Sequence, residues 1–134
     1  MEFQVTFEIP FADIDQHGVL HHPKYLNYLE QARIKLLENL GLSYQLWIER
    51  GYMLPVSELQ VRYLAPLKMG HAFCVTIPRL ELRARRAIHL FYQGHQVPTN
   101  HLVCEAVVKL ICVRIQDNRV ATIPTAWFER LQSY

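Results

Sequence analysis

The chain has 134 residues, of which 51% are hydrophobic and 19% are charged, and its formal net charge is +2 at pH 7. This length suits one domain with one hydrophobic core, and the composition is typical of a globular chain, not a disordered one. The small charge argues against nucleic acid as the main partner, and no apolar run reaches the roughly 20 residues that span a bilayer. We therefore expect a single domain over residues 1–134, with no nucleic-acid partner and no membrane insertion.

The first 40 residues predict a strand, a polar loop and a long helix. Apolar and polar residues alternate over residues 3–9, which is the period of a strand with one buried face. Over residues 23–40 the apolar positions recur at helical spacing and form a broad stripe. Pro23 suits the first helical turn, and Gly41 suits the position just past the helix end. This pattern predicts a long helix that is well buried.

Strands predominate in the rest of the chain. A shorter helix is predicted between Ser43 and Gly51, and a short terminal helix over residues 125–131. The candidate strands are 56–63, 74–82 (interrupted by Pro78), 87–92 and 103–115, with turns at Gly70, 94–98 and 117–118. Consecutive strands with short connections form an antiparallel sheet, and an apolar helix needs such a sheet to cover it. The sequence thus predicts an α+β fold, with an antiparallel sheet wrapped around one long central helix. Its edge strands are a reason to pair two sheets in a dimer.

The three cysteines, Cys74, Cys104 and Cys112, lie within apolar runs. An odd count without paired spacing argues against a disulfide framework and against a zinc site, so we expect buried thiols in a reducing compartment. The first residues lack the basic region and apolar run of a secretory signal, and we expect a cytoplasmic protein. His17, His21 and His22 match no common zinc spacing, so no metal is expected there.

The polar loop before the long helix is the strongest candidate for chemistry. A carboxylate such as Asp15 can attack a carbonyl carbon directly or can act as general base on water. The free N–H groups at the start of a helix suit a carbonyl oxygen that becomes negative, and Gly18 allows a sharp turn there. The alternative interpretation is that Asp15 is only a turn or capping residue.

This loop resembles a motif of the hotdog-fold acyl-CoA thioesterases, of the 4-hydroxybenzoyl-CoA thioesterase type and its Tol–Pal-associated relatives. Residues 59–66, which end in Tyr-x-x-Pro, are similar to the second strand of that family, and residues 104–113 are similar to its last long strand. The matching positions in the loop and helix are Asp13, Asp15, Gly18, Val19, Leu20, His21, His22, Tyr25, Glu30 and Arg33.

The resemblance implies a hotdog fold and hydrolysis of acyl-CoA thioesters without a metal or organic cofactor. It implies that Asp15 carries catalysis, that Gly18 and His22 belong to the active-site loop, and that the start of the 23–40 helix faces the thioester carbonyl. It also implies a homodimer or homotetramer with the active site at the subunit interface.

Other positions have two interpretations each. Arg85 and Arg86, in a basic cluster at a predicted hairpin, are either solvated or bind the phosphates of coenzyme A. Trp47, Tyr52 and Met53 either line an acyl pocket or belong to the core. Asp13 is expected to orient the loop. Glu30 and Arg33, three residues apart on the helix, are expected to form a buried or interfacial ion pair.

Several alternatives stay open at this stage. The substrate could be an acyl group on acyl carrier protein in place of CoA. The chain could instead be a hydratase or dehydratase of acyl thioesters, or a binding module without activity, although neither has a reason for the Asp15 loop. The sequence does not choose between nucleophile and general base, between dimer and tetramer, or among short aliphatic, long aliphatic, benzoyl and dihydroxynaphthoyl groups.

Overall fold

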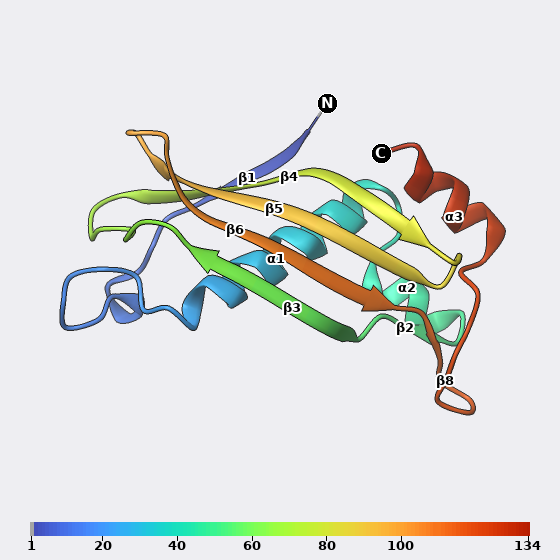
Figure 1. Cartoon of the computed structure of the whole chain (residues 1–134). Coiled ribbons are helices and arrows are strands. Elements are labelled where there is room, and N and C mark those ends of the chain that lie inside the picture. The colour runs from blue at the N-terminus through green and yellow to red at the C-terminus, as the bar shows by residue number, and fades with distance from the viewer. Residues whose placement is uncertain (1) are drawn as a thin grey trace.

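The computed structural model describes residues 2–134, and its elements follow the predicted order along the chain (Figure 1). The helices are η1 (Phe11–Asp13), α1 (Lys24–Asn39), α2 (Tyr44–Glu49) and α3 (Thr125–Gln132). The strands are β1 (Phe3–Phe7), β2 (Tyr52–Met53), β3 (Val56–Tyr63), β4 (Ala72–Arg83), β5 (Ala87–Val97), β6 (His101–Ile111), β7 (Val113–Arg114) and β8 (Arg119–Val120).

The main sheet has five strands in the order β1-β4-β5-β6-β3, and every pair in it is antiparallel. Helix α1 lies across one face of this sheet, and the three short strands β2, β7 and β8 form a second sheet beside one end (Figure 1). The predicted α+β hotdog arrangement, with a sheet around one long helix, is therefore confirmed.

The core lies between α1 and the sheet. The helix buries one broad stripe because its apolar residues recur every three or four positions. Pro23 was expected in the first turn but lies just before it, with φ −67°. Gly41 follows the helix end with φ +72°, as predicted. The buried side chains of the helix are Tyr25, Tyr28, Leu29, Ala32, Arg33, Leu36 and Leu37, and those of the facing strands include Phe73, Val75, Ile77, Ile88, Leu90, Val108 and Leu110.

The structure differs from the sequence-based expectation at Gly94. We expected residues 94–98 to form a turn, but β5 continues to Val97 and Gly94 lies inside it. A Cβ atom at this position would lie 2.7 Å from Cζ of Phe73 and 2.6 Å from Sγ of Cys104, on the two neighbouring strands. Gly94 is thus a packing glycine that makes room for the Phe73 ring, not a turn residue.

Two further differences concern strand pairing. The predicted strand 103–115 is split into β6 and β7 at Cys112, because β6 pairs with β5 and β3 whereas Val113 and Arg114 pair with β2 and β8. Pro78 does not end β4, since it sits where the pairing with β5 shifts register between Thr76 and Arg79. A proline, which lacks an N–H group, is tolerated at such an irregularity.

We expect the substitution Gly94→Ala to destabilise the protein by about 1–3 kcal/mol, because the added methyl group overlaps Phe73 and Cys104. Urea unfolding followed by far-UV circular dichroism measures this change. The control is Gln93→Ala at the exposed neighbouring position of the same strand, for which we expect little change. Equal stability of the two variants would contradict the packing role of Gly94.

Candidate active site

The loop between β1 and α1 lies at one end of the molecule, beside the β3–β4 connection and the β5–β6 hairpin (Figure 1). Two hydrogen bonds tie it to the β3–β4 connection: the N–H of Leu20 donates to the carbonyl of Leu67 at 2.8 Å, and the N–H of Met69 donates to that of Gly18 at 2.9 Å. Gly18 has φ +80°, the left-handed conformation that glycine favours, and this lets the loop reverse direction after Asp15.

The Asp15 carboxylate is held by the loop that contains it. Its Oδ1 atom accepts hydrogen bonds from the N–H groups of His17 at 2.7 Å and Val19 at 3.4 Å. The Nδ1 atom of His17 lies 3.9 Å from the same oxygen, and the Asp15 side chain is a quarter exposed. Within residues 2–134 no group donates to Oδ2, so this oxygen remains available as an acceptor.

These contacts keep Asp15 ionised at neutral pH. Partial burial alone would raise the pKa of the carboxyl group, but the two N–H donors and the nearby His17 and His21 more than offset it, so the pKa is lowered. A group whose pKa is lower in the folded state favours folding above its unfolded pKa, and this contribution is lost as the pH falls through the folded pKa.

Asp13 has a different environment and fits the orienting role that the sequence suggests. Its Oδ2 atom accepts a hydrogen bond from the Tyr28 hydroxyl, and Nζ of Lys24 lies 3.8 Å from Oδ1. Its carbonyl accepts the N–H of His21 at 2.9 Å. Burial, and then the hydrogen bond and charge of Asp13, raise the pKa of Tyr28, so the phenol stays protonated. Asp13 therefore anchors the loop to helix α1.

Just before α1, one N–H group has no acceptor in residues 2–134. The first helical N–H groups are already engaged in short-range bonds: Lys24 donates to the carbonyl of His21 at 2.8 Å, and Tyr25 to that of His22 at 3.4 Å. Pro23 has no N–H group. No acceptor for the N–H of His22 is found in the described part of the chain. If the helix start binds an oxyanion, as the sequence predicts, the N–H of His22 is therefore the group available to donate to it.

Tyr63, at the end of β3, contacts His22. No role was assigned to it from the sequence. Its hydroxyl donates to the carbonyl of His22 at 3.1 Å, and its ring meets the His22 ring edge to face at 6.1 Å. The only signal in the sequence was its place in the Tyr-x-x-Pro stretch, which carried no role.

Arg85 and Arg86 lie far from Asp15 in the same chain. Both are exposed in the β4–β5 hairpin, at the opposite end of the sheet from the β1–α1 loop (Figure 1). The guanidinium of Arg85 stacks over the Phe128 ring at 4.5 Å, next to α3. One subunit therefore does not bring these arginines to the candidate active site.

Trp47 belongs to the core and not to an acyl pocket. It is completely buried, its ring lies 4.7 Å from that of Trp127, and its Nε1 donates to the carbonyl of Leu42 at 3.0 Å. Tyr52 and Met53 are half-buried in β2, and the Tyr52 ring packs 6.1 Å from Trp127. All of these residues lie at the end of the fold away from the Asp15 loop.

The expected pair of Glu30 and Arg33 is present. Nη2 of Arg33 lies 3.7 Å from Oε2 of Glu30, and its other nitrogens donate to the hydroxyls of Tyr44 at 2.8 Å and Tyr92 at 3.3 Å. Arg33 is buried while Glu30 is exposed. These bonds satisfy a buried guanidinium and link α1 to α2 and β5, a structural role.

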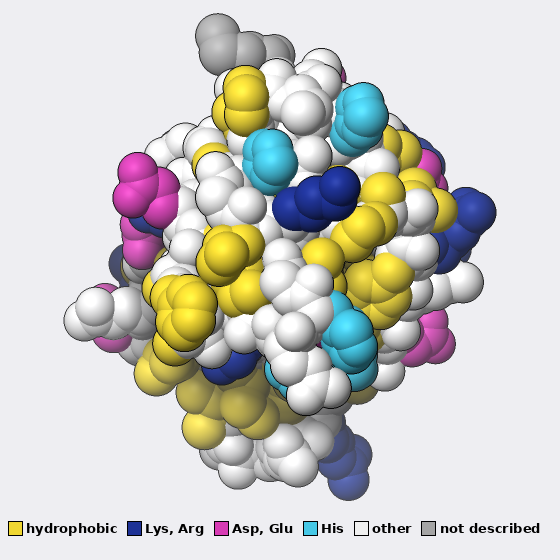
Figure 2. All heavy atoms as spheres, turned by 90° about the vertical axis from the view of Figure 1, so that its left-hand side faces the viewer, with side chains coloured by type: hydrophobic (Ala, Val, Ile, Leu, Met, Phe, Trp, Pro, Cys, Tyr) yellow, Lys and Arg dark blue, Asp and Glu magenta, His cyan; other side chains and the backbone are white. Residues whose placement is uncertain are grey.

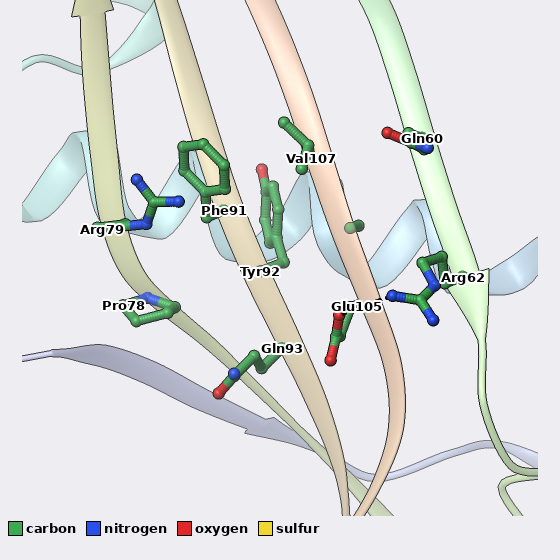
Figure 3. Close-up of a pocket in the computed structure, with 10 residues that line it drawn as sticks. Gln60, Arg62, Pro78, Arg79, Phe91, Tyr92, Gln93, Glu105 and Val107 are labelled. Carbon is green, nitrogen blue, oxygen red and sulfur yellow. Dashed lines mark ion pairs between the residues drawn. The ribbon is translucent and has the colours of Figure 1, made fainter.

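Two hollows differ in their suitability for a substrate. A groove of about 210 Å³ runs beside α1 and is mostly apolar; its lining residues are Leu26, Leu29, Glu30, Arg33, Val56, Leu59 and Val108. A larger hollow of about 430 Å³ lies on the face of the sheet that points away from α1 (Figure 3). It contains the ion pair Arg62–Glu105, and Arg79 covers the Phe91 ring at 3.6 Å. No residue of the Asp15 loop lines either hollow, but the groove begins at Leu26, in the first turn of the helix that follows the loop, so it is the better candidate.

Histidine side chains gather among hydrophobic ones on the end of the molecule that carries the loop (Figure 2). In residues 2–134 no three His, Cys, Asp or Glu side chains come together in a way that could hold a metal ion. The described helices are each too short or too polar to cross a membrane.

Comparisons with known proteins agree with this architecture. Residues 9–131 match the Thioesterase-like superfamily. The chain is 33% identical over 125 residues to the 1,4-dihydroxy-2-naphthoyl-CoA hydrolase of Thermosynechococcus vestitus, covering 90% of this chain and 84% of that protein. It is 32% identical over 103 residues to the chloroplastic acyl-acyl carrier protein thioesterase ATL3 of Arabidopsis thaliana, covering 77% of this chain and 54% of that protein.

A solved structure supports the same assignment. The protein TT1821 of Thermus thermophilus superimposes with a TM-score of 0.88 at 32% sequence identity, and the match covers 98% of each chain. The chain therefore belongs to the Thioesterase-like superfamily of hotdog proteins, and it is a thioester hydrolase.

We expect the Asp15 carboxyl to titrate below the usual value of 3.8, because its N–H donors and the neighbouring histidines favour the charged form. A carbon-detected NMR titration of the Asp15 side chain, assigned with the Asp15→Asn variant, measures this pKa. The substitution His17→Gln should raise it, since one of the two nearby positive charges is lost. A wild-type pKa above 3.8 would contradict the described geometry.

Proposed function

We propose that the protein hydrolyses acyl-CoA thioesters, that Asp15 supplies the oxygen chemistry, and that the N–H of His22 receives the carbonyl oxygen. The observation that carries this proposal is that two free groups, at Asp15 and His22, belong to the same loop between β1 and α1. These groups are the unused Oδ2 of an ionised carboxylate and an N–H without an acceptor in residues 2–134. One can act on a carbonyl carbon and the other on the oxygen attached to it.

The reaction has two possible routes. As nucleophile, Asp15 attacks the carbonyl carbon, the C–S bond breaks and CoA leaves as a thiolate that takes up a proton. Water then hydrolyses the mixed anhydride and regenerates the carboxylate. As general base, Asp15 takes a proton from a water molecule that attacks the carbon directly. Both routes yield the free acid and CoA, and both place negative charge on the oxygen near His22.

The apolar groove beside α1 is the proposed acyl site. Its first lining residue, Leu26, lies in the first turn of α1, four residues after His22 in the sequence. Leu29 and Leu59 continue the apolar lining from the helix and from β3. An acyl group whose carbonyl is bound at the helix start can therefore extend along this groove.

Acyl carrier protein is the second candidate for the thiol carrier. The similarity to ATL3, which is named as an acyl-acyl carrier protein thioesterase, favours it. The chemistry at Asp15 is the same for both carriers, because they share the thioester. A substrate panel should therefore contain both.

We expect Asp15→Asn to lower kcat on acyl-CoA roughly 100-fold or more, because an amide has no charged oxygen for attack or for proton abstraction. Release of thiol from a panel of acyl-CoAs and acyl carrier proteins, detected with a thiol reagent, measures the effect and identifies the acyl class. The matched control is Asp117→Asn, which removes an exposed carboxylate paired with Arg114. We expect the control to keep wild-type turnover. Full activity of Asp15→Asn would remove Asp15 from the mechanism.

We further propose that two subunits pair through β3. This strand is a free edge of the main sheet, and it exposes the apolar side chains of Val56, Leu59 and Tyr63. An exposed apolar edge favours pairing with another chain, and a two-fold axis would continue the sheet with antiparallel strands. A homodimer through this edge is the simplest assembly, and a homotetramer would join two such dimers.

This pairing would give Arg85 and Arg86 a role at the active site. A two-fold axis near the middle of β3 reverses the direction of the second sheet, so the arginine hairpin of one subunit comes to the end that carries Asp15 in the other. The arginines could then bind the phosphates of CoA while Asp15 of the first subunit acts on the thioester.

Mixing two inactive or weakened variants tests this arrangement. We expect Arg85→Ala/Arg86→Ala to raise KM for acyl-CoA but not for an acyl-pantetheine, which lacks the nucleotide phosphates. When this variant is mixed with Asp15→Asn and the subunits are exchanged, mixed dimers contain one complete site, and about a quarter of the sites should regain wild-type kinetics. The exposed Arg50→Ala serves as control. Recovery no greater than the sum of the separate activities would show that Asp15 and the arginines do not cooperate across subunits.

A further inference from the structure

The phenol of Tyr63 binds the carbonyl of His22, the residue whose N–H has no acceptor in residues 2–134, although Tyr63 belongs to another element. The bond from its hydroxyl to the His22 carbonyl, 3.1 Å long, joins residues 41 positions apart in the sequence. Tyr63 is the last residue of β3, whereas His22 precedes the first turn of α1. This contact therefore connects the edge strand of the sheet to the active-site loop.

Successive peptide groups around the free N–H of His22 are each fixed by a hydrogen bond. The N–H of His21 is bound to the Asp13 carbonyl at 2.9 Å, and the His21 carbonyl is bound by the N–H of Lys24 at 2.8 Å. The following peptide joins His22 to Pro23 and offers only its carbonyl, which Tyr63 binds. The His22 carbonyl accepts one other hydrogen bond, from the N–H of Tyr25, and that bond is longer, at 3.4 Å. Loss of the Tyr63 bond would therefore remove the stronger of the two restraints on this carbonyl.

The Tyr63 side chain is itself held in place. Its ring meets the rings of His22 at 6.1 Å and Tyr25 at 5.1 Å, in both cases edge to face. The chain directly after it is anchored to β6, since the N–H groups of Leu64 and Ala65 donate to the Val103 carbonyl at 2.8 and 3.2 Å. Burial, and then the nearby Cys104, raise the pKa of the phenol. Tyr63 thus stays a neutral donor throughout the working pH range.

We infer that Tyr63 is a positioning residue, whose hydroxyl fixes the His22–Pro23 peptide and thereby orients the His22 N–H toward the thioester oxygen. The inference rests on the function proposed above. A donor that is already oriented stabilises developing charge without reorganisation, so loss of the orientation should affect the transition state more than substrate binding. Tyr63 is also half-exposed on the proposed pairing edge, so assembly of the dimer would further restrain it.

The test is Tyr63→Phe, which keeps the ring and removes only the hydroxyl. We expect kcat to fall about 10-fold while KM changes less than about 2-fold, because a misplaced donor weakens mainly the transition state. The subunit mass by light scattering should stay that of the wild type. The matched control is Tyr134→Phe, whose hydroxyl binds the N–H of Phe3 at 2.8 Å and the carbonyl of Ile77, away from the loop. We expect this control to keep kcat and KM.

A second measurement does not depend on activity. The backbone ¹⁵N order parameter of His22 should be near the rigid value of about 0.85 in the wild type and clearly lower in Tyr63→Phe, but unchanged in Tyr134→Phe. An unchanged order parameter in Tyr63→Phe, or unchanged kcat in an otherwise active enzyme, would overturn the positioning role alone. By contrast, a wild-type protein without Asp15-dependent turnover would overturn the proposed function, and the order parameter would still decide the role of Tyr63.

Discussion

The fold depends on the burial of helix α1. Its stripe of buried residues, among them Leu29, Leu36 and Leu37, is too broad for one neighbouring helix to cover. Each such leucine contributes about 1.5–3 kcal/mol when it leaves water, so the sheet gains by curving around the helix. Strands β4, β5 and β6 follow one another through short connections and are therefore antiparallel, and β1 and β3 pair antiparallel at the two outer edges. The positions of most other elements follow from the need of the sheet to cover α1.

The same constraint places the candidate active site. A helix that lies along the sheet must begin at one end of it, and the chain from β1 reaches that beginning through the loop that contains Asp15. Many backbone groups there are hydrogen-bonded, either within the loop or to the β3–β4 connection. Within residues 2–134, Oδ2 of Asp15 and the N–H of His22 have no hydrogen-bond partner, and these two groups are of the kind that thioester chemistry needs.

The long helix, the alternating strands and the Asp15 loop could be predicted because each depends on residues that are close together in the sequence. The exact use of Gly94 could not, since a glycine in a polar stretch usually marks a turn and its real partners, Phe73 and Cys104, come from two other strands. The separation of Arg85 and Arg86 from Asp15 was also hidden, because it depends on the direction of β4 in the sheet and not on any local pattern.

The sequence by itself determined the class of fold and the burial of α1, because periodicity and local turn chemistry act over a few residues. The choice of Asp15 as candidate carboxylate is what the resemblance of its loop to the thioesterase motif implies. The tertiary structure alone decided which N–H at the helix start stays free and what holds it. That choice depends on Pro23 and on short-range bonds of Lys24 and Tyr25, but also on Tyr63, which is 41 residues away. The contact between Tyr63 and His22 forms only when the packed core brings β3 and the loop before α1 together. For this reason a local sequence pattern does not predict it.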